Sequence, residues 1–296
     1  MIHRRNLIAV SAALAGVSAL GARRAHADDG FAGLERAFAG IEAKRGGRLG
    51  VAVIDTADGR RAGYRRDERF PMCSTFKCLA AAAVLASVDA GRDKLERVIR
   101  FTKKDVKTYS PATEPHADGE GMTLAEICEA AVTLSDNTAG NLMLGAIDGP
   151  PGLTSFLRGI GDKVTRLDRF ELELNEALPG DPRDTTTPAA MAGSLRTLAL
   201  GDALSAKGKT QLVLWLRACK TGDKRLKAGL PAGWQVGDKT GTGQRNTSND
   251  VGLLFPPGGR PPIVVAAYLT QGAADGSVRD AALADVGAAV AAAVGG

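Results

Sequence analysis

The feature that most constrains the fold of this chain is the position of its strand-like segments, which lie at both ends and enclose a long helical middle. Residues 49–54 follow the two-residue alternation of a strand, and the Asp58-Gly59 turn leads into a second strand. Further strand patterns cover residues 234–239, 250–255 and 263–270. The economical fold is a sheet domain built from both ends of the chain, with an all-helical domain inserted between them.

Helical periodicity supports the same division. Apolar residues recur at helical spacing in a segment at each end of the chain and in several middle segments: 32–44, 80–90, 124–134, 137–146, 189–200, 207–217 and 277–294. We predict a two-domain α/β fold in which helices from both termini flank an antiparallel sheet. The sheet domain comprises residues 28–68 and 220–296, and the helical domain comprises 69–219. A cleft between two domains is a common place for a ligand site.

The first 27 residues have the composition of an export signal. The basic pair Arg4-Arg5 precedes an apolar stretch at 7–20, and Ala25-His26-Ala27 is a small-x-small cleavage site. The basic pair Arg23-Arg24, close to the cut, is typical of twin-arginine signals. Because the apolar stretch is too short to span ~30 Å of hydrocarbon, we expect a cleaved signal rather than a permanent anchor. The sequence therefore predicts a secreted or periplasmic protein, cut near Ala27.

Charge and metal-ligand content exclude several function classes. Four arginines in the first 27 residues carry most of the formal net charge of +5, leaving about +1 on the rest and no obvious basic stripe for nucleic acid. The chain has four cysteines, no CxxC pair and a single histidine beyond the leader, His116. These are too few for a zinc cluster, and a Ser-His-Asp hydrolase would have only one base available. We expect no metal and no cofactor.

Ser74-Thr75-Phe76-Lys77 opens a helical segment after Phe70 and Pro71. The serine and the lysine lie one turn apart on the same face, and the N–H groups of a helix start favour a developing oxyanion. A serine hydroxyl needs a neighbouring base to become a nucleophile, and Lys77 can serve if its surroundings lower its pKa. Taken alone, the same residues could be a helix cap followed by an exposed lysine.

Two further motifs are weak individually. Ser135-Asp136-Asn137 lies between two helices, where it could simply cap the second, or could supply a proton relay and an amide for a substrate carbonyl. Lys239-Thr240-Gly241 lies on a strand, where the lysine could protect a sheet edge, or could bind a substrate carboxylate together with Thr240. Gly241 would allow a substrate to approach the strand, and the N–H of Thr242 could join that of Ser74 as an oxyanion donor.

The three motifs SxxK, SDN and KTG, in this order and on these elements, are far more specific together. The chain resembles the class A serine β-lactamases over essentially its whole mature length. The resemblance implies the two-domain fold predicted above, with the active site in the cleft. It also implies hydrolysis of the lactam amide of penicillins and cephalosporins through an acyl-enzyme on Ser74, which confers antibiotic resistance.

The segment Arg169-Phe170-Glu171-Leu172-Glu173-Leu174-Asn175 resembles the family's omega loop, here 169–184. The resemblance implies that Glu171 and Asn175 hold the hydrolytic water, and that Arg169 and Asp184 close the neck of the loop. A buried acyl ester persists unless water is positioned and deprotonated, so hydrolysis requires such a pair. The alternative for Glu171 is an ordinary surface carboxylate, and Glu173 serves as a control expected to be dispensable.

Other positions carry over with departures from the family pattern. Tyr109 matches the aromatic wall of the cleft. Arg225 occupies one of two places where members hold the guanidinium that recognises the substrate carboxylate, and the other place is Ser248 here. We therefore expect Arg225 to bind the carboxylate, although it could instead belong to a solvated cluster with Lys224 and Lys227.

The cysteines depart from the family pattern as well. Cys128 matches one half of a common disulfide, but the partner position is Ala81, so only Cys78, one turn away, could substitute. Cys73 adjoins the nucleophile as in some carbapenem-hydrolysing members, whereas the position of its partner there is Gly243 here. This absence argues against strong carbapenemase activity.

Two other functions remain open at this stage. A penicillin-binding D-Ala-D-Ala peptidase would share all three motifs but would not need Glu171 and Asn175. A non-catalytic β-lactam receptor would need a transmembrane signalling region. For the hydrolase, Lys77 or Glu171 acting through water would activate Ser74, Ser135 would pass a proton to the departing nitrogen, and Asn137 would help to hold the substrate. We expect a monomer whose partners are a β-lactam and a catalytic water, with no stable membrane insertion once the signal is removed.

Overall fold

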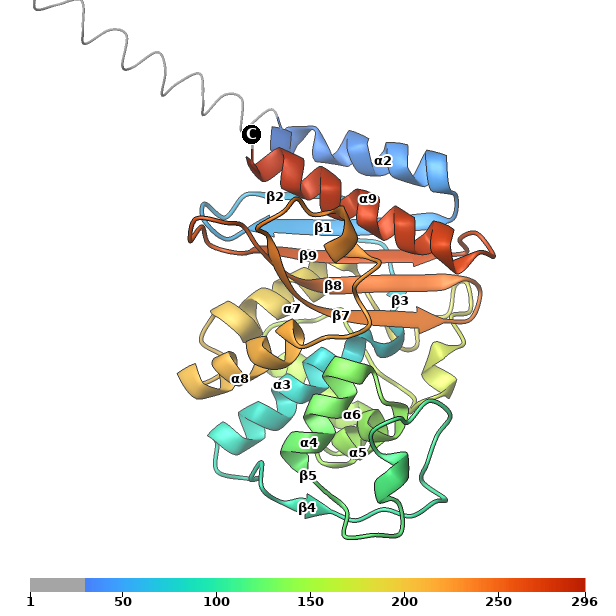
Figure 1. Ribbon diagram of the computed structural model, residues 1–296, viewed down its shortest axis with the longest axis vertical. Helices are drawn as coiled ribbons and strands as arrows, with labels where there is room; N and C mark the ends of the chain where they lie inside the picture. Colours follow the sequence, from blue (N-terminus) through green and yellow to red (C-terminus); the bar gives the residue numbers. More distant parts are fainter. Residues whose placement is uncertain (1–29, 296) are drawn as a thin grey trace, which may run out of the picture.

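The structure, a computed structural model, describes residues 30–295 and is built around one antiparallel sheet of five strands (Figure 1). The strand order is β2-β1-β9-β8-β7, so strands from the two ends of the chain pair directly at β1 and β9. The five strands are β1 (Arg48–Asp55), β2 (Arg61–Tyr64), β7 (Gln235–Gly243), β8 (Thr247–Phe255) and β9 (Ile263–Thr270). The predicted α/β fold with an antiparallel sheet is confirmed. The predicted leader at 1–27 lies outside the described residues.

Both faces of the sheet are covered by helices, because alternate residues along each strand are apolar on opposite sides. Val51 and Val53 of β1 pack on one face with α2 (Leu34–Arg45) and α9 (Gly276–Gly295), whereas Ala52 belongs to the core on the other face. The helices α2 and α9 lie side by side, and a Cβ placed on Gly30 would be 3.3 Å from the carbonyl oxygen of Ala293 (Figure 1). The two ends of the described chain are therefore neighbours.

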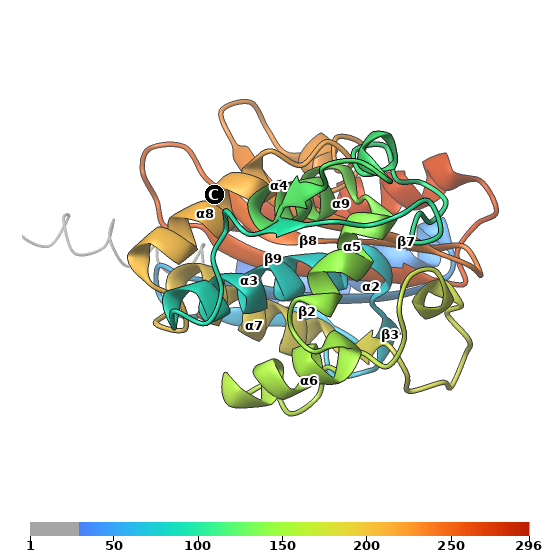
Figure 2. The ribbon, with the colours of Figure 1, turned by 90° about the horizontal axis from the view of Figure 1, so that it is seen from below.

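The remaining helices form a layer on the opposite face (Figures 1 and 2). Two of them, α7 (Pro188–Leu200) and α8 (Ala206–Arg217), pack against the sheet, and α3 (Phe76–Asp89) packs against α8. The others are α4 (Leu124–Glu129), continued by a π-helical turn at Ala130–Leu134, α5 (Asn137–Gly145) and α6 (Gly149–Gly159). The sequence analysis predicted no helix at the position of α6.

Short elements join these layers. Two-residue strand pairs are formed by β3 (Phe70–Pro71) with β6 (Thr185–Thr186), and by β4 (Val98–Ile99) with β5 (Met122–Thr123). Single 3₁₀ turns occur at Cys73–Thr75, Glu114–His116, Glu173–Asn175 and Leu226–Gly229. The first of these turns leads into α3 beside the edge strand β7. The start of α3 and the strand that carries Lys239 therefore meet.

Candidate active site

Ser74 and Lys77 lie where α3 begins. Ser74 is in the 3₁₀ turn at Cys73–Thr75, and Lys77 is in the first turn of α3, so their side chains point to the same side. The Lys77 Nζ donates to Ser74 Oγ at 2.9 Å, and both side chains are buried. The lysine is therefore placed as a proton acceptor for the serine hydroxyl whenever it is neutral.

Three more oxygens surround the Lys77 ammonium group. It lies 2.8 Å from Asn137 Oδ1, 2.9 Å from the Ser135 carbonyl and 2.9 Å from Glu171 Oε1. Burial lowers the pKa of Lys77 and the Glu171 carboxylate opposes that shift. The two effects compete at one atom, so Lys77 can change its protonation state when a neighbouring charge changes.

Glu171 reaches the same serine from the opposite element. Its Oε1 accepts from Ser74 Oγ at 3.0 Å, and its Oε2 accepts from Asn175 Nδ2 at 2.5 Å. The backbone of Glu171 is fixed on both sides by the amide of Asn141, at 2.8 and 2.9 Å. Glu173, two residues further on, is exposed. The surface-carboxylate interpretation of Glu171 is therefore wrong, since its side chain is buried beside Ser74.

The loop that carries Glu171 is closed at its neck by a short ion pair. Arg169 Nε lies 2.6 Å from Asp184 Oδ2, while Asp184 Oδ1 accepts the backbone N–H groups of Asp168 and Arg169. A second carboxylate, Glu176, pairs with Arg169 at 2.7 Å. Asp184 is almost fully buried, so removing Arg169 would leave a costly unpaired charge.

Ser135 links the two buried lysines. Its carbonyl accepts from Lys77, as described above, and its hydroxyl lies 2.9 Å from Lys239 Nζ. The residue adopts the left-handed conformation, with φ of 62°, where the π-helical turn ends. Asp136 then caps α5 by accepting the N–H of Ala139 at 2.8 Å and is further held by three hydrogen bonds from Ala112 and Thr113. This network places the Ser135 hydroxyl against Lys239 and the Ser135 carbonyl against Lys77.

Lys239 lies in β7, the edge strand of the sheet, and is fully buried. Burial and the neighbouring Lys77 lower the pKa of Lys239 to about 8. The next residue, Thr240, shares a 2.5 Å hydrogen bond with the hydroxyl of Thr221. Because β7 pairs only with β8, its outer edge faces the start of α3.

Arg225 is buried rather than solvated, so the surface-cluster alternative is wrong. Its guanidinium donates to the carbonyls of Gly241 and Asn249 at 2.9 and 2.7 Å and to Thr242 Oγ1 at 2.8 Å, and it pairs with Asp280 at 2.9 Å. A rigid guanidinium next to Thr242 can meet a substrate carboxylate without losing side-chain freedom.

A cavity of about 310 Å³ joins these groups. It is lined by most of the residues singled out from the sequence, namely Ser74, Tyr109, Ser135, Asn137, Asn175, Arg225, Thr240 and Thr242, and by Thr221. Lys77, Glu171 and Lys239 lie behind this wall and contact it through the hydrogen bonds given above. Gly241 allows the close approach of the strand to α3, because a Cβ there would lie 2.7 Å from the Met72 carbonyl. All twelve predicted site residues therefore meet in one place.

The sequence analysis missed several residues that position this site. Asn141 holds the backbone of Glu171, Asp280 pairs with Arg225, and Thr221 contacts Thr240. Arg279 also donates to Ser248 Oγ at 3.1 Å. Of these, only Asn141 had a usable signal, since it lies one helical turn after Asn137. The others come from distant segments that only the folded chain brings together.

The four cysteines are free, so Cys78 and Cys128 are not joined. Cys78 instead donates to the Thr75 carbonyl at 3.1 Å. Cys73 is buried against Gly243, where a Cβ would lie 2.5 Å from its Sγ. Within residues 30–295 there is no group of three or more His, Cys, Asp or Glu side chains that could hold a metal. No helix in this range is long and apolar enough to cross a membrane.

The chain is similar to proteins of known kind. The sequence profile of the β-lactamase enzyme family matches residues 33–294. Beta-lactamase FAR-1 of Nocardia farcinica is 51% identical over 229 residues, which cover 77% of this chain and 72% of that protein. Beta-lactamase CTX-M-8 of Citrobacter amalonaticus is 49% identical over 238 residues, 80% of this chain and 81% of that protein. The solved structure of an ancestral (GNCA) class A β-lactamase is 65% identical, covers 87% of this chain and 98% of its own, and superposes with a TM-score of 0.85.

Proposed function

The chain belongs to the class A β-lactamase family and hydrolyses β-lactam antibiotics, which confers resistance, and we propose that it does so through an acyl-enzyme on Ser74. One observation carries this proposal. The hydroxyl of Ser74 lies 2.9 Å from a buried ammonium group and 3.0 Å from a buried carboxylate. Such a hydroxyl has a candidate base on each side: the carboxylate, and the lysine once it is neutral.

In the acylation step, Ser74 Oγ attacks the lactam carbonyl carbon and loses its proton. Two acceptors are within reach: Lys77 Nζ lies 2.9 Å and Glu171 Oε1 lies 3.0 Å from Ser74 Oγ, so either can take the proton directly, and Glu171 can also act through a water. The carbon–nitrogen bond then breaks, and Ser135 gives its proton to the departing nitrogen and is reprotonated through one of the lysines that contact it. The backbone N–H groups of Ser74 and Thr242 would stabilise the oxyanion, a role worth about 3–4 kcal/mol per donor.

In the deacylation step, Glu171 and Asn175 hold a water against the ester. Glu171 takes a proton from that water, the hydroxide adds to the ester carbonyl, and Ser74 leaves and recovers a proton. The hydrogen bond from Asn175 to Glu171 aims the carboxylate, and the Asn175 Oδ1 is buried without a protein partner, so it is free to accept from the water.

The substrate is held by the groups that line the cavity. Lys239, Thr240 and Arg225 would bind its carboxylate, and Asn137 its side-chain carbonyl. Tyr109, which is exposed at the mouth of the cavity, would pack against the substrate, and Gly241 leaves the strand open to it.

The contacts of Glu171 favour a hydrolase over the two alternatives. A cell-wall peptidase or a β-lactam receptor needs the serine and the lysines, but it does not need a buried carboxylate beside the serine with an amide partner such as Asn175. We further propose that the protein is a monomer that is exported by a twin-arginine signal, and that this signal is cleaved near Ala27. The sheet domain would comprise residues 28–68 and 220–296, and the helical domain 69–219.

The test compares the parent with Glu171→Ala and with the matched control Glu173→Ala. We expect steady turnover of a chromogenic cephalosporin by the parent and by the control. Glu171→Ala should give one burst and a stable adduct on Ser74, visible by intact mass. Loss of a general base predicts deacylation slowed by about 10²–10⁴-fold. If the parent itself stops after one burst, the proposed hydrolase function is wrong and the peptidase or receptor function is favoured.

A further inference from the structure

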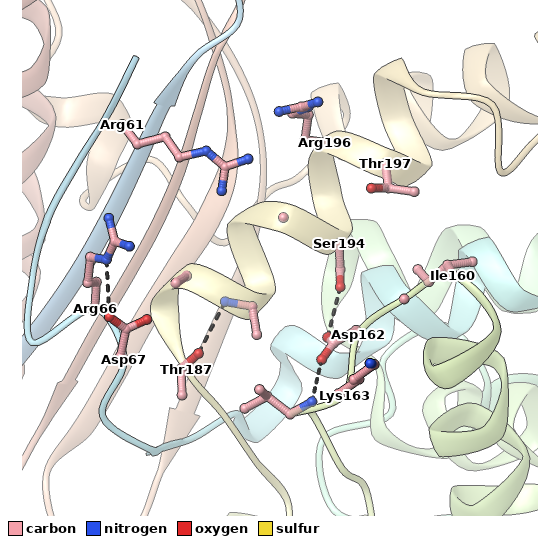
Figure 3. Close-up of a pocket in the computed structure, with 15 residues that line it drawn as sticks. Arg61, Arg66, Asp67, Ile160, Asp162, Lys163, Thr187, Ser194, Arg196 and Thr197 are labelled. Atoms are coloured by element: carbon pink, nitrogen blue, oxygen red, sulfur yellow. Dashed lines mark hydrogen bonds and ion pairs between the residues drawn. The ribbon is translucent and has the colours of Figure 1, made fainter. Parts of the chain in front are cut away.

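A second pocket lies away from the active site and is larger. It has a volume of about 510 Å³, within the ~300–1,000 Å³ of small-molecule sites. Its walls come from β2, from the loop after α6 and from α7, and Figure 3 shows their side chains. None of the residues that line it lines the active-site cavity.

The pocket has an excess of positive charge. Four cationic side chains line it, Arg61, Arg66, Lys163 and Arg196, against two carboxylates. Arg66 is paired with its neighbour Asp67 at 3.2 Å. The other three form no ion pair or side-chain hydrogen bond within residues 30–295. In Figure 3, Arg61 and Arg66 extend from the β2 side towards the flank of α7 from which Arg196 projects.

The second carboxylate, Asp162, makes no ion pair with these cations. Its Oδ1 accepts the backbone N–H groups of Val164 and Thr165, both at 2.9 Å, and its Oδ2 accepts from Ser194 at 2.8 Å. Three donors already satisfy this buried group, and Figure 3 shows it turned towards Ser194. The cations outnumber the carboxylates in the pocket, and like charges repel one another, so an anion between the unpaired cations would be stabilised.

The floor of the pocket is left open by a glycine. Gly193 lies in the interior of α7, and a Cβ placed on it would meet nothing within 4 Å. Glycine destabilises the interior of a helix relative to alanine, and no contact within residues 30–295 requires it here. The start of α7 is not itself the site, because the N–H groups of Ala189 and Ala190 are bonded to the Arg66 carbonyl and to Thr187 Oγ1.

We propose that this pocket binds the phosphate group of a small organic phosphate, with Arg61 and Arg196 as its main ligands. Guanidinium groups bind phosphate through paired N–H···O bonds, and a phosphate dianion offers enough oxygens for two of them. The Thr197 hydroxyl also lines the pocket, and Lys163 adds a further charge. The volume exceeds the need of a bare ion, so an esterified phosphate fits better than free phosphate.

The test is calorimetric titration with glucose 6-phosphate, inorganic phosphate and citrate in parallel. Three proteins are compared: the parent, Arg61→Gln/Arg196→Gln, and the control Arg36→Gln/Arg92→Gln, which removes two exposed cations elsewhere. We expect saturable binding of glucose 6-phosphate to the parent and the control, and a loss of at least about tenfold in affinity in Arg61→Gln/Arg196→Gln. Gly193→Ala should also weaken binding while keeping the helix intact.

Unchanged cephalosporin turnover establishes that each variant is folded. Binding that survives Arg61→Gln/Arg196→Gln would place the anion elsewhere, for instance beside Lys239 in the active site, and would overturn the proposal. An equal loss of affinity in the control would mean that only the net charge of the protein matters, which would overturn the proposal. Absence of saturable binding to the parent would also overturn it. Tighter binding of citrate than of either phosphate would contradict the assignment of a phosphate group, whereas tighter binding of inorganic phosphate would contradict the esterified ligand.

Discussion

Replacing Gly243 by alanine probes how tightly the end of β7 is packed against the catalytic loop. A Cβ at this position would lie 2.5 Å from Cys73 Sγ and 2.9 Å from the Asn175 carbonyl oxygen. Both distances are shorter than van der Waals contact, so one neighbour must move. Cys73 cannot turn away easily because it is buried and its backbone is left-handed, with φ of 46°. Overpacking of this kind costs about 1–3 kcal/mol.

The direction of the movement determines the effect on catalysis. A displacement of Asn175 would carry away the amide that aims Glu171, so deacylation should slow in Gly243→Ala while acylation changes less. Adding Cys73→Ala removes the 2.5 Å contact but leaves the 2.9 Å contact. The double variant should therefore regain about 1 kcal/mol relative to the sum of the single variants, without recovering the deacylation rate.

Urea unfolding followed by tryptophan fluorescence measures the free energy of unfolding of each variant. Single-turnover kinetics separate the rate of acylation from the rate of deacylation. Gly40→Ala is the control, because a Cβ at Gly40 in α2 meets nothing within 4 Å and alanine should stabilise that helix by roughly 0.5–1 kcal/mol. Additivity of Gly243→Ala and Cys73→Ala within about 0.5 kcal/mol would refute the assigned clash. An unchanged deacylation rate in Gly243→Ala would refute the link to Asn175.

Further predictions concern three buried charged groups. The pKa of Lys239 is lowered to about 8, so KM for a carboxylate-bearing β-lactam should rise as pH increases through 8. A KM that stays constant up to about pH 10 would contradict the role of Lys239 in binding the substrate carboxylate. Because the folded pKa of Lys239 lies below its ordinary value of 10.5, its contribution to the free energy of unfolding should grow between pH 8 and 10.5. Burial and the Asp238 carboxylate raise the pKa of Asp250, so the stability that its proton provides is present at low pH and lost as pH rises through the folded pKa. Asp250→Asn should therefore gain stability relative to the parent from about pH 4 upwards in urea titrations. A difference in stability that does not depend on pH would argue against this. Arg225→Leu leaves Asp280 and two carbonyls unpaired, so it should cost about 3–5 kcal/mol in unfolding experiments and also raise KM; a rise in KM with unchanged stability would show that the buried contacts contribute little.

The sheet and the catalytic motifs could be predicted from the sequence because their signals are local. Residues 49–54 alternate with the period of a strand, residues 263–270 form a short apolar run of strand length, and these segments are β1 and β9. The SxxK and SDN motifs lie where helices begin, and the KTG motif lies inside a strand, so each could be placed by inspection. What brings these elements together is the pairing of distant strands, which an α/β arrangement with both termini in one sheet already implies.

The helix α6 could not be predicted because its first residues have the composition of a loop. Gly149-Pro150-Pro151-Gly152 reads as a turn. Proline is tolerated in the first turn of a helix, where its missing N–H is not needed. A Cβ at Gly152 would lie 1.7 Å from the Ile147 carbonyl, so close packing requires glycine there. The composition reflects how tightly the chain turns from Ile147 into α6, which the periodicity of apolar residues does not report.

The charged residues that contact the site, Asp280 and Arg279, also could not be predicted from the sequence. Asp280 lies in α9, 55 residues after Arg225, and Arg279 reaches Ser248 across 31 residues. Neither has a motif, and each is recognisable only because α9 packs on the sheet beside β8. Residues that orient a catalytic group need only the right position in space, and many side chains could fill that position.

The proximity of Gly30 to Ala293 means that the described chain is nearly a closed ring. A short linker could join α2 to α9, and new ends could be opened at the exposed glycines Gly258 and Gly259 between β8 and β9. The permuted protein would begin with β9 and α9, continue through α2, β1 and β2, and finish with β7 and β8. In such a molecule the part of the sheet formed by β9, β1 and β2 would be made first, and the catalytic strand β7 would be added near the end together with its partner β8.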